Sequence, residues 1–314
     1  MPIEPLNPSS VLPFEATHWS LEAAAADLPT LSLVMPIYNA GPYLERTLRS
    51  LLLNDLDGVE IIVMDGASTD NTPDILAHYA PLFHEMVSEP DSGQSDAINK
   101  GFARASGDIL GWLNGDDLVL PDTLNAVRAA FRDSPEADVV VGDAAMVDLD
   151  LEVTHAFRTA PENLTFAHLL DYASHHLVQP SVFFTRKAWE AAGPLDETLH
   201  YAMDADLFLT MARTMTLVHL PREIAYSVYH EEAKTRRHRA ASLSELALVE
   251  ARHGGLEEAR RTLDRLVALY NEALAGGGAT GEGPGSLMAR RLAAVEAETA
   301  ANRRFLLGTL GTPE

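Results

Sequence analysis

The chain of 314 residues contains no cysteine, which excludes disulfide bonds and thiolate metal sites. No uninterrupted apolar run reaches the roughly 18 residues of a membrane-spanning helix, so we expect no integral membrane segment. The N-terminus lacks a basic segment followed by a hydrophobic one, and no signal peptide is expected. These absences together favour a cytoplasmic protein.

Basic side chains are also scarce. The chain has 23 Lys and Arg against 46 Asp and Glu, which gives a net charge of -23. Residues 1–230 carry 34 acidic and 11 basic side chains, whereas residues 231–314 carry 12 of each, so the whole imbalance lies in the first segment. An acidic main body disfavours binding to nucleic-acid phosphates and to anionic lipid. We therefore expect no nucleic-acid partner.

Short apolar segments alternate with amphipathic ones in the first half of the chain. Strands are predicted at 31–35, 59–64, 84–87, 109–113 and 139–141, and helices at 41–54, 71–79, 92–105 and 121–132. Strands that alternate with helices at this spacing predict an α/β fold with a mostly parallel, Rossmann-type central sheet flanked by helices.

The two ends of the chain differ from this pattern. Residues 1–30 contain five prolines and little periodicity, and we interpret them as an N-terminal arm. Residues 236–314 are predicted to form a helical C-terminal extension with a Gly-rich, flexible linker at 276–286. Its helices are expected to pack on the main domain or on a second copy of the chain, which makes a homo-oligomer a candidate. No chemistry is expected in this extension.

Two adjacent carboxylates, Asp116 and Asp117, directly follow the apolar segment 109–113. Asn114-Gly115 is a turn dipeptide, so the pair is predicted at the carboxyl end of a strand, where open α/β sheets bind ligands. Neighbouring like charges persist more readily when a cation compensates them, and oxygen ligands suit Mg²⁺ or Mn²⁺. The alternative is a solvated acidic turn in which Asp117 begins the next helix.

Polar residues follow the other predicted strands as well. Asp65 can accept hydrogen bonds from a base or a ribose, or it can cap its own turn. The helix after residue 92 offers an N-terminus to an anion, and Lys100 on it either reaches a phosphate or is a solvated helix residue. A strand at 179–184 and a helix beginning within 201–209 follow in the second half. Asp204 lies in the first turn of that helix, where the helix dipole stabilises a carboxylate and keeps it ionised.

Four segments occur in a fixed order: Pro36-x-Tyr38-Asn39, Asp65-Gly66-x-Ser68-Thr69-Asp70-x-Thr72, Glu89 to Gly101, and Trp112-Leu113-Asn114-x-Asp116-Asp117. In order and spacing they resemble the inverting family-2 glycosyltransferases over residues 31–235. The resemblance implies a GT-A fold that binds a nucleotide-diphosphate sugar and a divalent cation. Residues 31–143 would form the nucleotide-binding half and residues 144–235 the acceptor half of one catalytic domain.

The resemblance also implies roles for individual residues. In that family the aspartate matching Asp65 holds the base, the one matching Asp116 lies near the ribose, and the one matching Asp117 binds the metal. Asp204 matches the catalytic base. The implied nucleotide-binding residues are Pro36, Tyr38, Asn39, Asp65, Asp91, Lys100, Asn114, Asp116 and Lys234, and the acceptor-side residues are Gln179 and Met203.

His230 illustrates how much these roles depend on the resemblance. By itself, a lone histidine after a strand is more often a polar loop residue than a metal ligand. Members of this branch carry His-x-x-x-Lys here, which implies that His230 ligates the metal and that Lys234 meets the diphosphate. The chain departs from the family at Thr210 and Val228, where a basic residue is common, and this weakens any inference about how a phosphate is held.

The predicted reaction is metal-dependent, inverting transfer of a sugar from a nucleotide-diphosphate sugar, with a UDP-sugar as the expected donor. The acceptor is a hydroxyl of a carbohydrate or another molecule, as in polysaccharide, cell-envelope or glycoconjugate synthesis. The enzyme would be a hexosyltransferase with Mn²⁺ or Mg²⁺ as cofactor. The alternative is a non-catalytic nucleotide-sugar binding or assembly module, although a pure binder has no need for a base such as Asp204. A nucleotidyltransferase ranks last, because the loop at 36–41 contains no Lys or Arg.

Overall fold

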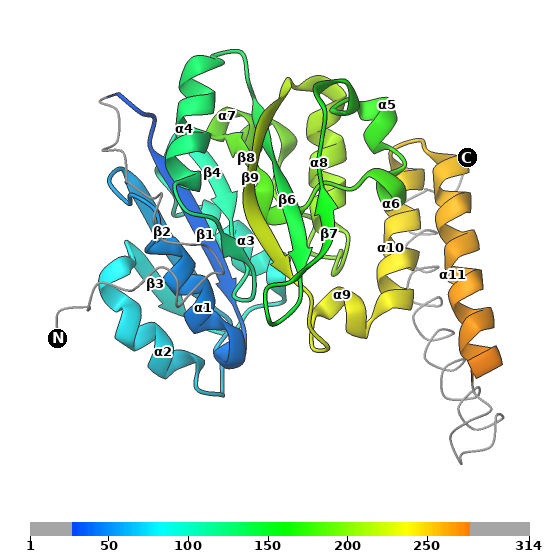
Figure 1. Ribbon diagram of the computed structural model, residues 1–314, viewed down its shortest axis with the longest axis horizontal. Coiled ribbons are helices and arrows are strands. Elements are labelled where there is room, and N and C mark those ends of the chain that lie inside the picture. The colour runs from blue at the N-terminus through cyan, green and yellow to red at the C-terminus, as the bar shows by residue number, and fades with distance from the viewer. Residues whose placement is uncertain (1–26, 277–314) are drawn as a thin grey trace, which may run out of the picture.

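The structure is a computed structural model that describes residues 27–276. Residues 1–26 of the predicted arm, nearly all of the predicted linker and everything after it lie outside the described residues. Within that range the strands form one nine-stranded sheet in the order β3-β2-β1-β4-β8-β6-β9-β5, with β7 paired to β6 (Figure 1). The α/β fold predicted from the sequence is confirmed.

The strands and helices have the following bounds. The strands are β1 (Leu31–Ile37), β2 (Val59–Asp65), β3 (Glu85–Ser88), β4 (Ile109–Trp112), β5 (Leu118–Val119), β6 (Val139–Val147), β7 (Val153–Phe157), β8 (Val182–Thr185) and β9 (Leu217–Val228). The longer helices are α1 (Gly41–Leu51), α2 (Thr72–Tyr79), α3 (Gln94–Phe102), α4 (Thr123–Asp133), α7 (Arg186–Ala192), α8 (Met203–Thr214), α10 (Arg239–Arg252) and α11 (Leu256–Gly276). The short helical turns are η3 (Ala80–Leu82), η4 (Pro161–Asn163), α5 (Phe166–Leu169), α6 (Tyr172–His175), η5 (Gln179–Ser181) and α9 (Lys234–Arg237).

The two halves of the sheet differ in strand direction. β1 pairs in parallel with both β2 and β4, and β3 pairs in parallel with β2. β8 is antiparallel to both β4 and β6, whereas β9 is parallel to β6. The first half is therefore the parallel sheet predicted from the sequence, and the second half is mixed. Because β1, β2 and β4 are adjacent and parallel, their carboxyl ends meet at one edge of the sheet.

The core lies on both faces of the sheet, as alternation along β1 requires. Leu33 and Met35 pack on the face covered by α1, α2 and α4, together with Leu48 of α1. Val34 points to the opposite face, which α3, α7 and α8 cover, and packs with Ile98 of α3. All five of these side chains are fully buried. Helices on both faces leave the strand ends as the place for a ligand.

Two predicted strands differ from the structure, and the strand β5 is an addition to the prediction. Residues 179–181 form a 3₁₀ turn, and the strand begins only at Val182, because Pro180 has no N–H to donate to a strand ladder. The strand predicted at 139–141 continues to Val147 and pairs with β9 along its length. The two-residue strand β5 was not predicted, since two residues are too few to show a period.

The C-terminal helices α10 and α11 lie side by side at the end of the molecule remote from β3 (Figure 1). Asp206 on α8 accepts from His253, just past α10, with 3.0 Å between Oδ1 and Nε2. Arg265 of α11 donates to the backbone oxygen of Ala173 in α6. The extension is therefore joined to α8, the helix that carries Asp204. Of the helices at residues 27–276, none is long and apolar enough to cross a membrane.

Candidate functional site

A cleft of 1230 Å³ lies along the carboxyl ends of β1 and β4 and reaches α8 and α10. Twelve of the fourteen site residues predicted from the sequence line it. The twelve are Pro36, Tyr38, Asn39, Asp91, Asn114, Asp116, Asp117, Gln179, Met203, Asp204, His230 and Lys234.

The two predicted residues outside the cleft lining are Asp65 and Lys100. Asp65 is 2% exposed, and its carboxylate accepts from the hydroxyls of Ser68 and Ser88. Lys100 Nζ lies 3.0 Å from the carboxylate of Asp96, one helical turn earlier. Both side chains are therefore engaged within the protein, and the geometry adds no support to their predicted contacts with a nucleotide.

The loops after β1 and β2 are tied to each other at the edge of the cleft. Asn39 has a φ of 47°, in the left-handed region that asparagine tolerates better than most residues. Its Oδ1 accepts from the Thr69 N–H at 2.9 Å, and its own N–H donates to Ser68 Oγ at 2.8 Å. Tyr38, beside it, is 66% exposed along the cleft. A fixed loop with an exposed aromatic ring can support a planar base by stacking.

Gly66 and Asp91 make a second close contact at this edge. A Cβ at Gly66 would lie only 2.6 Å from Asp91 Oδ2, so a side chain there would displace the carboxylate. Burial raises the pKa of Asp91, while the N–H of Gly93, which donates to its Oδ1, lowers it. Gly66 therefore lets an acidic group approach the backbone at the end of β2.

Asn114 connects the two halves of the cleft. Its Nδ2 donates to Asp117 Oδ2 at 2.9 Å and lies 3.2 Å from Gln179 Oε1. Its Oδ1 accepts from Gln94 at 2.7 Å. The Gln179 amide in turn donates to the backbone oxygen of Trp112. Both polar ends of Asn114 and of Gln179 are used within the protein, which fixes the turn that carries the paired carboxylates.

The two carboxylates of that turn, Asp116 and Asp117, differ in exposure and in hydrogen-bond partners. Asp116, one-third exposed, lies 3.0 Å from His230 through Oδ2 and Nε2. Asp117 is 5% exposed, and its Oδ1 accepts from the Val228 N–H. Burial, followed by the charge of Asp116, raises the pKa of Asp117 to about 7. Both carboxylates line the cleft, and Asp116 is the more exposed of the two.

A divalent cation fits the pair formed by Asp116 and His230. The His230 ring is 4% exposed and packs on the Tyr43 ring with 4.0 Å between centroids, and its Nδ1 has no hydrogen-bond partner among the described residues. Residues 27–276 hold no group of three or more Asp, Glu, His or Cys side chains that could bind a metal by themselves. One carboxylate and one imidazole suit an ion that takes its remaining ligands from substrate phosphates and water. The sequence resemblance gave Asp117 the metal and Asp116 the ribose, whereas the geometry brings Asp116 to His230.

Asp204 lines the same cleft from the first turn of α8. Burial raises the pKa of Asp204 to about 6, although the Ala205 N–H, which donates to its Oδ1, lowers it. A carboxylate with a pKa just below neutrality is ionised at neutral pH and is still basic enough to accept a proton.

Glu245 of α10 holds the loop that leads into α8. Its carboxylate accepts from three consecutive backbone N–H groups, those of His200 (2.8 Å), Tyr201 and Ala202 (2.7 Å). The Glu245 side chain is 7% exposed, so these bonds replace its lost hydration. The residue lies in the extension for which we expected no chemistry, yet it positions the turn before Asp204. An acidic residue between Leu243 and Leu246 was the available signal in the sequence.

We expect Glu245→Gln to lower the free energy of unfolding by about 1–3 kcal/mol, because the amide cannot accept from all three N–H groups. Urea unfolding followed by circular dichroism measures the change. Glu257→Gln on α11 is the matched control, since the Glu257 side chain is 73% exposed. A loss at Glu245 no larger than at Glu257 would contradict the proposed bracing.

Lys234 completes the cleft from the segment after β9. Its Nζ lies 5.4 Å from the centre of the Tyr201 ring. Desolvation by the surrounding protein lowers the pKa of Lys234, whereas the charges of Glu245 and Asp91 raise it. Arg239 and Ser242 of α10 line the same wall and were not among the predicted site residues. The C-terminal helices are thus part of the cleft and not an appendage to it.

This chain is similar to known glycosyltransferases in both sequence and fold. The family model for glycosyl transferase family 2 matches residues 32–191. The uncharacterized glycosyltransferase alr2836 of Nostoc sp. is 30% identical over 127 residues, which cover 38% of this chain and 39% of that protein. This chain therefore matches well under half of that relative's length.

Two solved structures share the fold. The mannosyltransferase PcManGT from Pyrobaculum calidifontis, in complex with GDP-Man and Mn²⁺, has a TM-score of 0.56 at 21% identity, with 88% of this chain and 83% of that one covered. S. aureus TarS 1–349, in complex with UDP-GlcNAc, has a TM-score of 0.55 at 18% identity, with 75% and 72% covered. At these identities the likeness concerns the fold, which is GT-A-like as predicted.

Proposed function

This chain belongs to glycosyltransferase family 2, and on that premise we propose that it transfers a sugar from a nucleotide-diphosphate sugar to an acceptor hydroxyl with inversion. One observation carries the proposal: the Asp116–His230 pair and Asp204 line one cleft. A non-catalytic binding module would not need a carboxylate of raised pKa at the start of α8.

Asp204 acts in this mechanism as the general base. It accepts the proton of the acceptor hydroxyl while the oxygen forms a bond to the anomeric carbon, and the bond from that carbon to the diphosphate oxygen breaks on the opposite face. The attack and the departure on opposite faces invert the configuration. Asp204 returns the proton to solvent after the product leaves.

The other end of the cleft meets the leaving diphosphate. We propose that Asp116 and His230 hold a Mn²⁺ or Mg²⁺ ion, with Asp117 bracing the turn through its hydrogen bonds to Val228 and Asn114. When bound, such an ion neutralises negative charge on phosphate oxygens. Lys234 lines the same cleft and adds a positive charge there, which favours the departure of an anion. Tyr38, Asn39 and Asp91 are proposed to contact the nucleoside, and uridine is the first base to test.

We expect nucleotide diphosphates to raise the melting temperature of the full chain only when Mn²⁺ or Mg²⁺ is present. A ligand at 100 times its Kd adds about 2.7 kcal/mol to the stability of the state it binds. A thermal-shift screen of UDP, GDP and ADP, each with metal and with excess chelator, measures the effect. If no diphosphate stabilises the protein under any metal condition, the donor site is not where we place it.

The corresponding activity test is release of nucleoside diphosphate from a donor sugar. Candidate donors are UDP-GlcNAc and GDP-Man, which the two structural neighbours contain. Slow hydrolysis of one donor in the absence of an acceptor identifies the donor even before the acceptor is known. Retention of configuration in an isolated transfer product would overturn the proposed inversion.

A further inference from the structure

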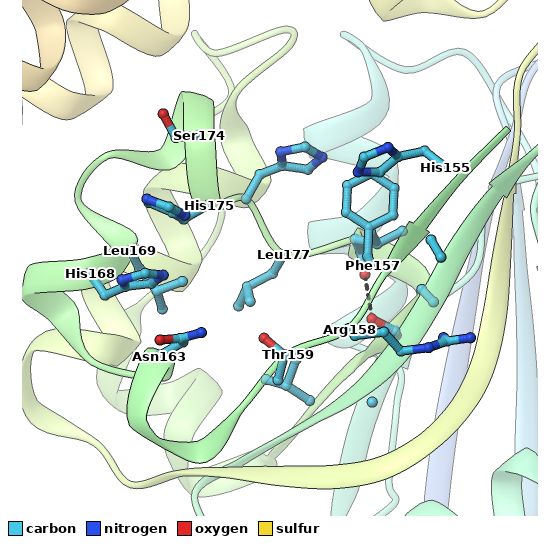
Figure 2. Close-up of a pocket in the computed structure, with 17 residues that line it drawn as sticks. His155, Phe157, Arg158, Thr159, Asn163, His168, Leu169, Ser174, His175 and Leu177 are labelled. Carbon is cyan, nitrogen blue, oxygen red and sulfur yellow. Dashed lines mark hydrogen bonds between the residues drawn. The ribbon is translucent and has the colours of Figure 1, made fainter.

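A second, smaller cavity of 230 Å³ opens between β6, β7 and the turns η4, α5 and α6 (Figure 2). It shares lining residues with the main cleft, among them Phe157, His176 and Leu177. The cavity is therefore a side pocket of the cleft. None of the residues predicted from the sequence lines it.

The side pocket joins the cleft on the side of Asp204. Tyr172, which is 4% exposed, lines the main cleft together with Asp204, and burial followed by the charge of Asp204 raises the pKa of Tyr172. The Tyr172 ring is 6.4 Å from the ring of His176, and His176 is 4.9 Å from Phe157, both measured between centroids. These rings lead from the proposed base into the side pocket. An acceptor whose hydroxyl reaches Asp204 can extend along them, away from the diphosphate.

The lining of the pocket combines apolar and polar groups. Leu169, Leu177 and Val178 are buried and supply apolar surface. Asn163, Thr159 and His168 lie around the same hollow in Figure 2. Aromatic and aliphatic surface suits the C–H faces of a sugar ring, and side-chain amides, hydroxyls and imidazoles bond its hydroxyl groups.

Charge decides between a neutral ligand and an anionic one. Of the described residues that line the pocket, Arg158 alone is a Lys or Arg, and it is paired with Glu223 at 2.5 Å. Burial, followed by the influence of His155, lowers the pKa of His176, so its ring is neutral at neutral pH. A phosphate or carboxylate would therefore meet no unpaired Lys or Arg among the described residues that line the pocket. A neutral ligand with many hydroxyls matches the lining better.

We propose that this side pocket is an acceptor subsite that holds a neutral sugar residue of a saccharide acceptor. The proposal rests on the transferase function above, with Asp204 as the base, and extends it to the class of acceptor. The sugar in the pocket lies next to the hydroxyl that is glycosylated, with one face on Phe157. The polar side chains of η4 and α5 then determine which sugar is accepted.

The test compares two neighbouring positions on η4 in the full chain. Asn163→Phe fills the pocket, whereas Glu162→Phe adds the same ring at an exposed position that does not line it. Asn163→Leu removes the amide at similar volume and serves if the phenylalanine variant does not fold. Saturation-transfer NMR measures binding of methyl glycosides of glucose, galactose, mannose and N-acetylglucosamine, with and without UDP and Mg²⁺.

We expect at least one glycoside to bind the wild type and the Glu162→Phe variant equally. Both Asn163 variants should bind it about tenfold more weakly, because overfilling a packed site or removing a hydrogen-bond partner costs roughly that factor. The proposal is overturned if the Asn163 variants bind glycosides as the wild type does, or if the wild type binds none. It is also overturned if 4-hydroxybenzoate, an anionic aromatic acid used as the contrasting probe, binds the pocket and the glycosides do not. Thermal shifts with nucleotide diphosphates on the same samples test the donor site independently. A failure of the proposed transferase function can therefore be distinguished from a failure of the acceptor subsite.

Discussion

Asp204→Asn should lower the rate of sugar transfer by about two to four orders of magnitude, the usual contribution of a positioned general base. Asparagine keeps the size of the side chain and its Oδ1 can still accept from the Ala205 N–H, but it cannot take a proton. Nucleotide binding should be unchanged, because the Asp116–His230 pair lies elsewhere in the cleft. Single-turnover transfer under saturating donor and metal measures the loss.

The pH profile separates this role from a structural one. A base must be ionised to act, and burial raises the pKa of Asp204 to about 6. In the wild type, kcat/KM should therefore be level above about pH 7 and fall roughly tenfold per pH unit below pH 6. The Asp204→Asn variant should lack that acid limb. A variant with the wild-type rate, or one that keeps the limb, would show that another group takes the proton.

Asp206→Asn is the matched control for this experiment. Asp206 lies in the same first turn of α8, where both carboxylates interact with the helix dipole. Its carboxylate is held by His253 and lies 3.6 Å from Arg252, away from the cleft. We expect Asp206→Asn to reduce stability while transfer stays within about tenfold of wild type. A loss equal to that of Asp204→Asn would mean that charge in the turn, and not proton transfer, is what matters.

The parts of the fold that follow from local pattern were predictable. The apolar run Leu33-Val34-Met35 of β1 is visible in the sequence, and so is the turn at Asn114. Parallel strands bring their carboxyl ends together, so polar residues after β1 and β4 had to share a cleft. Lys100 is an exception that the sequence could have explained, since Asp96 lies four residues before it on the same helix face.

Other features depend on tertiary contacts that no local pattern reveals. Glu245 meets the loop before α8 across more than forty residues of sequence, so only the packed fold brings them together. The side pocket is lined by β6, β7 and the turns η4, α5 and α6, and these turns are too short to show a hydrophobic period in the sequence. Which of two adjacent carboxylates lies nearer to His230 depends on the backbone of one turn. The resemblance of sequences assigned the metal to Asp117, whereas His230 Nε2 lies 3.0 Å from Asp116.

The proposal that Asp116 holds the metal predicts the second large effect on transfer rate, which we expect from Asp116→Asn. The variant should lose about 10²- to 10³-fold in transfer rate, as when one group that stabilises developing charge is removed. The difference in nucleotide affinity with and without chelator should also disappear, because a neutral amide is a poor ligand for a hard divalent cation. Calorimetric titration of UDP or GDP, with Mn²⁺ and with chelator, measures both affinities.

Asp117→Asn distinguishes the two carboxylates. The Asp117 oxygens accept from the Val228 N–H and from Asn114 Nδ2, so an amide there would set an NH₂ group against one of these donors. We expect a loss of stability of about 1–3 kcal/mol, with metal-dependent nucleotide binding still detectable. The opposite result, with metal dependence lost in Asp117→Asn and kept in Asp116→Asn, would return the metal to Asp117 and place Asp116 at the ribose. His230→Ala should lose metal-dependent nucleotide binding in the same way as the variant of the aspartate that holds the ion. We expect it to match Asp116→Asn, since His230 Nε2 lies 3.0 Å from Asp116.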